Sequence, residues 1–191
     1  MEQQEARSRV LAAAEELYYG RGIHAVGIDE VRDRAGVSLA KLYKLFPSKQ
    51  HLVAAYLTAR GRRLRAELAE YVDRAAPAPA TSTARLLAVF GHLRETIDAP
   101  EHRGCAFTNA WVEAGAHCGP ADALVAEAVR EHKRLLGDYL ADLAADRTDP
   151  RGVAEQIQLL TEGATVLSSI MGPDAARHAR RAATAVLDAD T

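Results

Sequence analysis

Apolar residues recur every three or four positions along most of the chain, which is the spacing of one helix face. Near the amino terminus this stripe consists of Val10, Leu11, Ala14, Leu17 and Tyr18, and glycines follow where a C-cap belongs. Serine, glycine and proline divide the rest of the chain into similar segments. The pattern predicts nine helices, over about residues 4–19, 28–35, 39–46, 48–72, 82–98, 105–116, 120–145, 151–171 and 173–187.

Composition agrees with a helical fold. The chain of 191 residues contains 39 alanines, and aromatic residues make up only 5%. Alanine has the highest helix propensity, whereas aromatic and β-branched residues favour strands, so we expect an all-α fold. The expected domains are a three-helix domain over residues 1–48 and a larger helical domain over residues 49–191. The proline-rich stretch 75–82 is expected to be a stiff connector.

Several protein classes are excluded at this level. No stretch approaches 18 uninterrupted apolar residues, and glutamates occupy the amino terminus where a signal peptide would be basic and apolar. We therefore expect a cytoplasmic protein without a membrane partner. No catalytic or phosphate-binding motif is present, so we expect no enzyme activity, no cofactor and no metal. The alternative, a metal held by Cys105, Cys118, His102 and His117, lacks a recognised ligand spacing.

Charge is divided unevenly along the chain. Residues 1–65 contain 12 basic and 7 acidic residues, a net charge of +5, whereas residues 66–191 contain 12 and 19, a net charge of −7. Residues 35–65 carry seven basic side chains and no carboxylate. Such a stretch is typical of a surface that binds a polyanion, although a solvated helix face would give the same count.

Residues 28–46 combine two short helices around a tight turn formed by Gly36, Val37 and Ser38. Helices of this length are unstable alone and persist only when they pack against other helices. The pattern is typical of a helix-turn-helix, with an ordinary corner between two helices as the alternative. The outward face of the second helix is predicted to carry Leu39, Ala40, Lys41, Tyr43 and Lys44, a small and basic surface that suits the DNA major groove.

Twelve positions in and after this segment together form one longer motif. They are Val31, Ala35, Gly36, Val37, Ser38, Ala40, Leu42, Tyr43, Phe46, Ser48, Lys49 and Leu52. In this motif the chain resembles the TetR family of one-component bacterial regulators, over about residues 5–60. The motif GCAFTNA at residues 104–110 is similar to the opening of the sixth helix in some members. The resemblance implies a DNA-binding domain followed by a domain for ligand sensing and dimerisation.

The resemblance also implies roles for single residues. It makes Tyr43 and Lys49 contacts to DNA phosphates, with Lys49 in a first helical turn, where free backbone N–H groups also favour anions. Ser38 and Ala40 are expected beside base edges, and Lys41, which replaces the usual threonine, can still reach a phosphate.

Two positions depart from the family pattern. Arg32 stands where alanine is usual, so its guanidinium is expected to point outward or to pair with Asp29 or Asp33. Leu45 stands where histidine or tyrosine is usual, and its side chain cannot contact a phosphate.

A homodimer is expected, because one short reading helix contacts too few bases for specific binding. The resemblance places a four-helix dimer bundle at the last two predicted helices. The residues assigned to the interface are Ile157, Leu160, Ala164, Leu167, Ala179, Ala183 and Val186. The alternative is that these helices only close the core of one chain.

A small-molecule pocket is also implied by the resemblance. Candidate lining residues are Phe90, Cys105, Phe107, Asn109, Trp111, Tyr139, Thr161 and Thr165, each of which would also suit a plain core. The expected function is a ligand-responsive transcriptional regulator, a repressor that a small molecule releases from a palindromic double-stranded DNA operator. The alternative, suggested by Arg32 and Leu45, is a helical small-molecule-binding protein with weakened or lost DNA binding.

Overall fold

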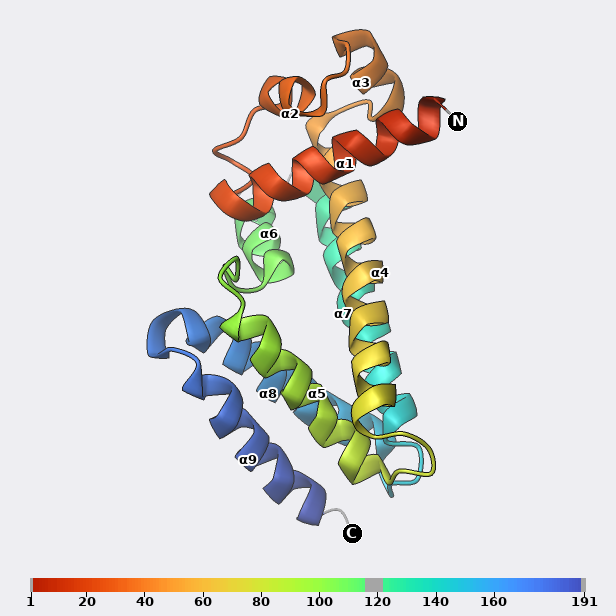
Figure 1. Ribbon diagram of the computed structural model, residues 1–191, viewed down its shortest axis with the longest axis vertical. Helices are drawn as coiled ribbons and strands as arrows, with labels where there is room; N and C mark the ends of the chain where they lie inside the picture. The colour runs from red at the N-terminus through yellow and green to blue at the C-terminus, as the bar shows by residue number, and fades with distance from the viewer. Residues whose placement is uncertain (1, 116–121, 190–191) are drawn as a thin grey trace. The chain divides into compact units, whose positions relative to one another are not determined.

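A computed structural model describes residues 2–115 and 122–189, and every regular element within these ranges is an α-helix (Figure 1). The helices are α1 (Glu2–Arg21), α2 (Ile28–Ala35), α3 (Leu39–Leu45), α4 (Lys49–Ala75), α5 (Ser82–Asp98), α6 (Ala106–Gly115), α7 (Asp122–Leu143), α8 (Pro150–Met171) and α9 (Asp174–Ala189). The predicted all-α class is confirmed, as is the predicted order of nine helices within the described residues.

Local capping chemistry sets several helix boundaries. At the start of α3, Ser38 Oγ accepts a hydrogen bond from the Lys41 backbone N–H, with an N–O distance of 3.2 Å. Thr81 and Asp149 cap the starts of α5 and α8 in the same way. Each cap satisfies a backbone N–H that the first helical turn leaves without a partner.

The turn between α2 and α3 depends on Gly36. Its backbone lies in the left-handed region, at φ 63° and ψ 42°, and its N–H bonds to the carbonyl oxygens of Arg32 and Asp33. A residue with a Cβ is strained in this conformation. Gly36 therefore ends α2 and reverses the chain, as the sequence predicts.

Some predicted features lie outside the described residues. These are the predicted helix ends at residues 116 and 120, and also His117 and Cys118. In the ranges 2–115 and 122–189, no group of three or more His, Cys, Asp or Glu side chains is arranged to hold a metal ion. Among the same residues, no helix has the length and apolar character needed to cross a membrane.

The described helices pack as two units, which we treat separately. The first unit contains α1, α2, α3, the start of α4 as far as Arg62, α6, and α7 as far as His132. Val10, Val31 and Leu42, from the first three helices, are fully buried in it. Because α2 and α3 have only eight and seven residues, this packing is what keeps them helical.

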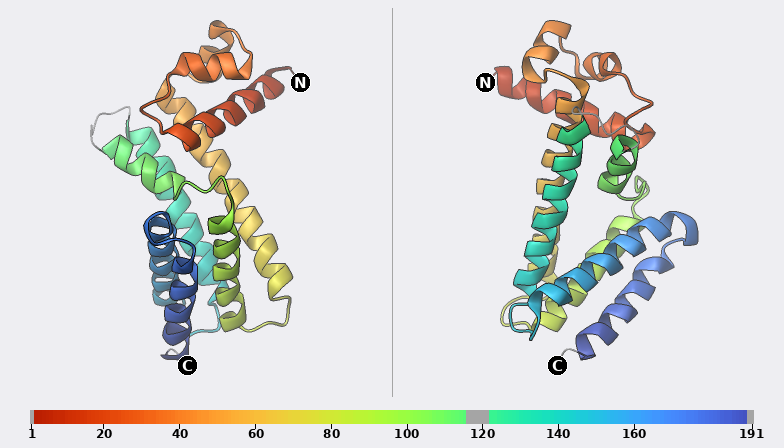
Figure 2. Two further views of the ribbon diagram at one scale, coloured as in Figure 1. Left: turned by 60° about the vertical axis from the view of Figure 1, so that its left-hand side comes forward. Right: turned by 180° about the vertical axis from the view of Figure 1, so that it is seen from behind.

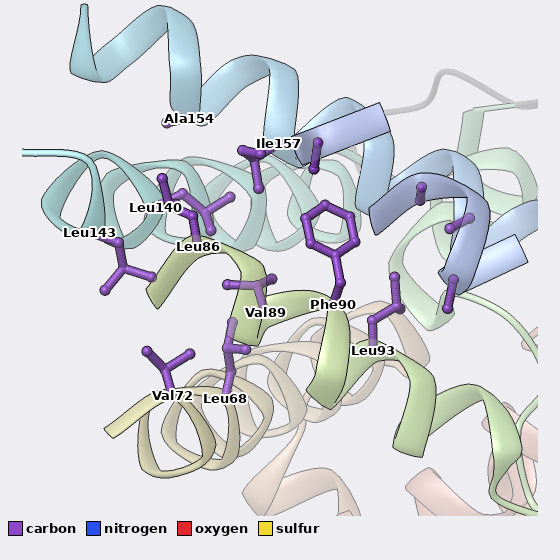
Figure 3. Close-up of a cluster of buried hydrophobic side chains, with 14 of the residues drawn as sticks. Leu68, Val72, Leu86, Val89, Phe90, Leu93, Leu140, Leu143, Ala154 and Ile157 are labelled. Carbon is purple, nitrogen blue, oxygen red and sulfur yellow. The ribbon is translucent and has the colours of Figure 1, made fainter. Parts of the chain in front are cut away.

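The second unit contains the rest of α4 and α7 together with α5, α8 and α9. Helices α5, α8 and α9 run side by side in it (Figure 2). One apolar cluster joins all five helices. Figure 3 shows Val72 from α4, Phe90 from α5, Leu140 from α7 and Ile157 from α8. Ala183 from α9 belongs to the same cluster. This cluster is the core of the second unit.

The predicted domain boundary differs from this division. The units separate within α4 and within α7, whereas the predicted boundary after residue 48 falls just before α4. Helix α6 and the first part of α7 also pack with the amino-terminal helices. A domain over residues 1–48 that folds by itself stays a prediction.

Replacement of Gly36 by alanine is expected to destabilise the chain by about 1–2 kcal/mol, because alanine is strained in the left-handed conformation. Urea unfolding followed by circular dichroism measures this change. The matched control is Gly20→Ala in α1, where no atom lies within 4 Å of an added Cβ and φ is not positive. The control is expected to be neutral or to stabilise by up to about 1 kcal/mol. Equal stability of Gly36→Ala and the wild-type chain would contradict the role given to this turn.

Candidate nucleic-acid interface

The exposed face of α3 is the candidate DNA-reading surface. Leu39 and Tyr43 each expose 44% of their surface, and Ala40 and Lys44 are exposed beside them. Leu39 and Tyr43 are four positions apart, as are Ala40 and Lys44, so the four residues share one helix face. Leu42, on the opposite face, is fully buried. The structure thus brings together four of the predicted outward residues, and Tyr43 is not a core tyrosine.

The other two predicted residues of the α3 segment have partners within the chain. Ser38 is exposed, but its hydroxyl oxygen is occupied as the cap of α3. Lys41 is half-buried, and its Nζ lies 3.7 Å from Glu2 Oε1 of α1. Contacts of both residues with DNA stay predictions.

Arg32 adapts to its unusual position in α2. Its guanidinium nitrogens lie 3.0 Å and 2.6 Å from carboxylate oxygens of Asp29 and Asp33, which confirms the predicted pairing. The hydrogen bond to Asp33 is the main cause that raises the pKa of Arg32. Val31 and Ala35 remain buried beside it, so Arg32 leaves the inner face of α2 intact.

The fold brings carboxylates to basic residues that have none nearby in the sequence. Arg60 forms an ion pair with Glu15 of α1, and its guanidinium lies 3.9 Å from the centre of the Tyr19 ring. By contrast, Lys44 has neither an ion pair nor a hydrogen bond among the described residues. Residues 35–65 therefore present fewer unpaired basic side chains than the charge count indicates. Lys44 is one of the side chains that remain unpaired among the described residues.

Helix α1 places a basic residue, Arg7, beside the end of α3, and the sequence analysis did not predict it. The guanidinium of Arg7 lies 4.7 Å from the centre of the Phe46 ring, directly after α3. A cation over an aromatic face is held in place by the ring quadrupole. Arg7 is far from α3 along the chain, and no motif marks it, so only the packing of α1 against α3 and α4 reveals this neighbour.

Lys49 is directed differently from Lys44. Its Nζ donates a hydrogen bond to the Ile23 carbonyl oxygen at 2.5 Å and lies 5.8 Å from the centre of the Tyr18 ring. Partial burial lowers the pKa of Lys49, and the charge of Glu113 acts in the opposite direction. The structure does not bring Lys49 onto the exposed face of α3, and its predicted phosphate contact stays untested.

A small cavity lies next to Tyr18 in the first unit. It has a volume of about 40 Å³, and its lining includes Tyr18, Asn109 and Glu113. The Tyr18 hydroxyl is buried and has no hydrogen-bond partner among the described residues. Burial raises the pKa of Tyr18 to about 12. The cavity is large enough for only a few water molecules.

The predicted pocket residues are divided between the two units. In the first unit, Phe107 stacks on His132 with a centroid distance of 3.6 Å, Asn109 is exposed, and Trp111 is exposed beneath the Arg130 guanidinium. In the second unit, Phe90 belongs to the apolar core, and the hydroxyls of Thr161 and Thr165 bond to carbonyls of their own helix. Tyr139 is half-buried against the core, and Cys105 Sγ lies 3.6 Å from Lys133 Nζ. Their function as an effector pocket stays a prediction.

An open groove between α4 and α5 was not predicted. It has a volume of about 350 Å³ and is lined by Glu67, Glu70, Tyr71, Arg74, His92, Glu95 and Thr96. Tyr71 and His92 meet edge to face, with centroids 5.5 Å apart. Partial burial lowers the pKa of His92, although Glu67 and Glu95 act in the opposite direction. These residues lie on two predicted helices, but periodicity alone gives no sign that the helices leave a groove between them.

The predicted interface residues fall into two groups. Ile157, Ala164, Ala179 and Ala183 are buried inside their own chain, whereas Leu167 is exposed. Leu160 and Val186 are half-buried. The apolar residues most exposed on α8 are instead Leu159, Ile170 and Met171, at 73%, 78% and 65%. The sequence analysis assigned none of these three residues to the interface, because an apolar stripe does not by itself separate the inner from the outer side of a helix.

A helix-turn-helix that exposes a short helix with an unpaired lysine, in a chain with a second and larger helical unit, is typical of DNA-binding transcriptional regulators. The family profile described as "Bacterial regulatory proteins, tetR family" matches residues 10–56. A second profile, "Tetracyclin repressor-like, C-terminal domain", matches residues 82–185. The chain belongs to the TetR family, whose members are transcriptional regulators and not enzymes.

Three similar proteins illustrate the family relationship. The HTH-type transcriptional activator FasR of Mycolicibacterium smegmatis is 51% identical over 53 residues, which cover 28% of this chain and 24% of that protein. The HTH-type transcriptional repressor KstR of Mycobacterium tuberculosis is 33% identical over 144 residues, which cover 75% and 60%. The crystal structure of a TetR-family regulator from Streptomyces coelicolor superimposes with a TM-score of 0.83 at 29% identity, over 98% and 96% of the chains. This chain thus spans less than two thirds of the length of each of these two curated relatives.

Proposed function

We propose that this protein is a ligand-responsive repressor that binds a palindromic double-stranded DNA operator as a homodimer. The observation that carries the DNA-binding part is the exposed face of α3, where Leu39, Ala40, Tyr43 and Lys44 lie together on a helix-turn-helix. Alanine and leucine offer apolar contacts to base edges, and the tyrosine hydroxyl and the lysine ammonium reach phosphates. Both an activator and a repressor occur among the similar proteins, so repression is a distinct part of this proposal.

The effector part of the proposal is supported by the family and by the second unit. A match to the tetracyclin repressor-like C-terminal domain covers most of the helices in that unit. A small molecule that binds one conformation better than the other shifts DNA affinity by its coupling free energy, typically about 1–3 kcal/mol or 5- to 150-fold.

The homodimer part of the proposal is supported by the outer face of α8. Leu159, Val166 and Ile170 are exposed at helical spacing, and the backbone at Gly163 has no atom within 4 Å of an added Cβ. A row of exposed apolar residues on one helix is typical of a protein interface. The lack of a side chain at Gly163 allows another helix to approach closely. A two-fold dimer through this face matches the symmetry of a palindromic operator.

The DNA-binding part predicts a gel shift with the DNA upstream of the protein's own gene. Lys44→Ala should weaken binding to all sequences, because it removes a phosphate contact and not a base contact. The slope of log affinity against log salt concentration should fall by about 0.9 for each half-site. An unchanged slope would reject Lys44 as a phosphate contact. The absence of any shift at low salt would favour the alternative, a small-molecule-binding protein that has lost DNA binding.

The effector part predicts that a small molecule releases this DNA. When the protein-free, low-molecular-mass fraction of a cell extract is added to the complex, the shifted band should disappear, with affinity reduced at least about fivefold. A control lane with an unrelated DNA-binding protein separates this effect from inhibition by salt. Tighter binding in the presence of the fraction would instead indicate that the effector is a corepressor.

The homodimer part predicts that Ile170→Glu converts the dimer to a monomer, because a charge would be buried against an apolar partner face. Sedimentation equilibrium measures the molar mass of each variant. Val112→Glu is the matched control, since Val112 is a similarly exposed apolar residue that belongs to α6 of the first unit and not to α8. A dimer that survives Ile170→Glu, or that is lost equally with Val112→Glu, would argue against this interface.

A further inference from the structure

The connection between α1 and α2 is held by two residues from distant parts of the chain. Lys49, in the first turn of α4, donates to the Ile23 carbonyl oxygen at 2.5 Å. Glu113, near the end of α6, accepts a hydrogen bond from the His24 backbone N–H at 2.7 Å, and the same carboxylate oxygen lies 3.3 Å from His24 Nδ1. Neighbouring residues of one short loop are thus tied to α4 and to α6, all within the first unit.

The surroundings of Lys49 differ from those expected of a phosphate-binding lysine. Lys49, His24, Glu113 and Asp122 line a partly open cavity of about 100 Å³ in the first unit. One N–H of the Lys49 ammonium donates to the Ile23 carbonyl oxygen, and the ammonium lies 5.8 Å from the centre of the Tyr18 ring. Lys44, only five residues earlier, is exposed and has no such partner among the described residues. Lys44 and Lys49, which the sequence analysis both assigned to DNA binding, therefore have different chemical environments.

The loop itself needs this support. Gly22 is in a left-handed conformation, at φ +89°, and the Glu113 carboxylate oxygens lie about 3.5 Å from where its Cβ would be. The loop leads directly into α2, whose N-cap Gly27 offers no side-chain cap. With a weak N-terminus on an eight-residue helix, the direction of α2 depends on where the loop is fixed.

We propose that Lys49 and Glu113 are positioning residues for DNA binding, which fix the α1–α2 loop and thereby the orientation of α2 and α3. In this arrangement Lys49 is not a phosphate contact. The inference rests on the proposed DNA-binding function, and it assigns to α6 a direct role in the geometry of the helix-turn-helix.

The salt dependence of binding distinguishes positioning from phosphate contact. A duplex selected from random-sequence DNA by the wild-type protein serves as the probe. Lys44→Met, the matched control, should lower the salt slope by about 0.9 for each half-site. Lys49→Met and Lys49→Gln should weaken binding about fivefold or more at every salt concentration, with the wild-type slope. A reduced slope in both Lys49 variants would overturn the proposal, because both variants remove the charge.

Glu113 is tested by loss and by conservative rescue. Glu113→Ala should weaken binding to the same duplex with an unchanged slope and should speed hydrogen exchange of the His24 amide. Glu113→Gln keeps an oxygen that accepts from the His24 N–H, so it should recover part of both losses. Wild-type affinity or wild-type exchange in Glu113→Ala would overturn the proposal. Amide exchange needs no DNA, so the positioning role of Glu113 and the proposed DNA-binding function can fail separately. If the wild-type protein selects no duplex, only the DNA-binding function is rejected.

Discussion

The structure depends on one physical constraint: a DNA-reading helix of seven residues cannot support itself. A helix as short as α3 gains too few backbone hydrogen bonds to offset the entropy lost when its first turn forms. It persists because Leu42 and Phe46 are buried, because Ser38 caps its first turn, and because Gly36 reverses the chain ahead of it. The rest of the first unit supplies this burial, which leaves the outer face of α3 free for contact with another molecule.

Electrostatics follow from the same packing. A linear stretch without carboxylates indicates a basic surface, yet the fold brings Glu15 to Arg60, Glu2 to Lys41 and the Glu113 charge to Lys49. Such pairs stabilise the folded chain only modestly where they are exposed, but they decide which cations remain available to DNA. On the exposed face of α3, this pairing leaves Lys44 as the lysine without an ion pair among the described residues.

In the second unit, packing divides the apolar residues of one helix between the core and the surface. Helix α8 has apolar residues around much of its circumference, and burial divides them into two faces. Ile157 and Ala164 pack inward with α5 and α9, whereas Leu159 and Ile170 face outward. The inner face closes the core of one chain, whereas the outer face of α8 is the surface that we propose for the homodimer.

The sequence by itself determined the all-α class, the order of the helices, the Gly36 turn, the Ser38 cap and the family register, because these depend on local propensity and on residues close together in the chain. It also offered the pairing of Arg32 with Asp29 or Asp33, which lie within one helical turn, as one of two outcomes, and the structure contains both pairs. Only the tertiary structure decided that Lys49 turns inward to Ile23, that Arg7 lies over Phe46, and that α6 packs with the amino-terminal helices. Those outcomes depend on contacts between residues tens of positions apart, and neither periodicity nor charge along a chain contains the distance between such residues.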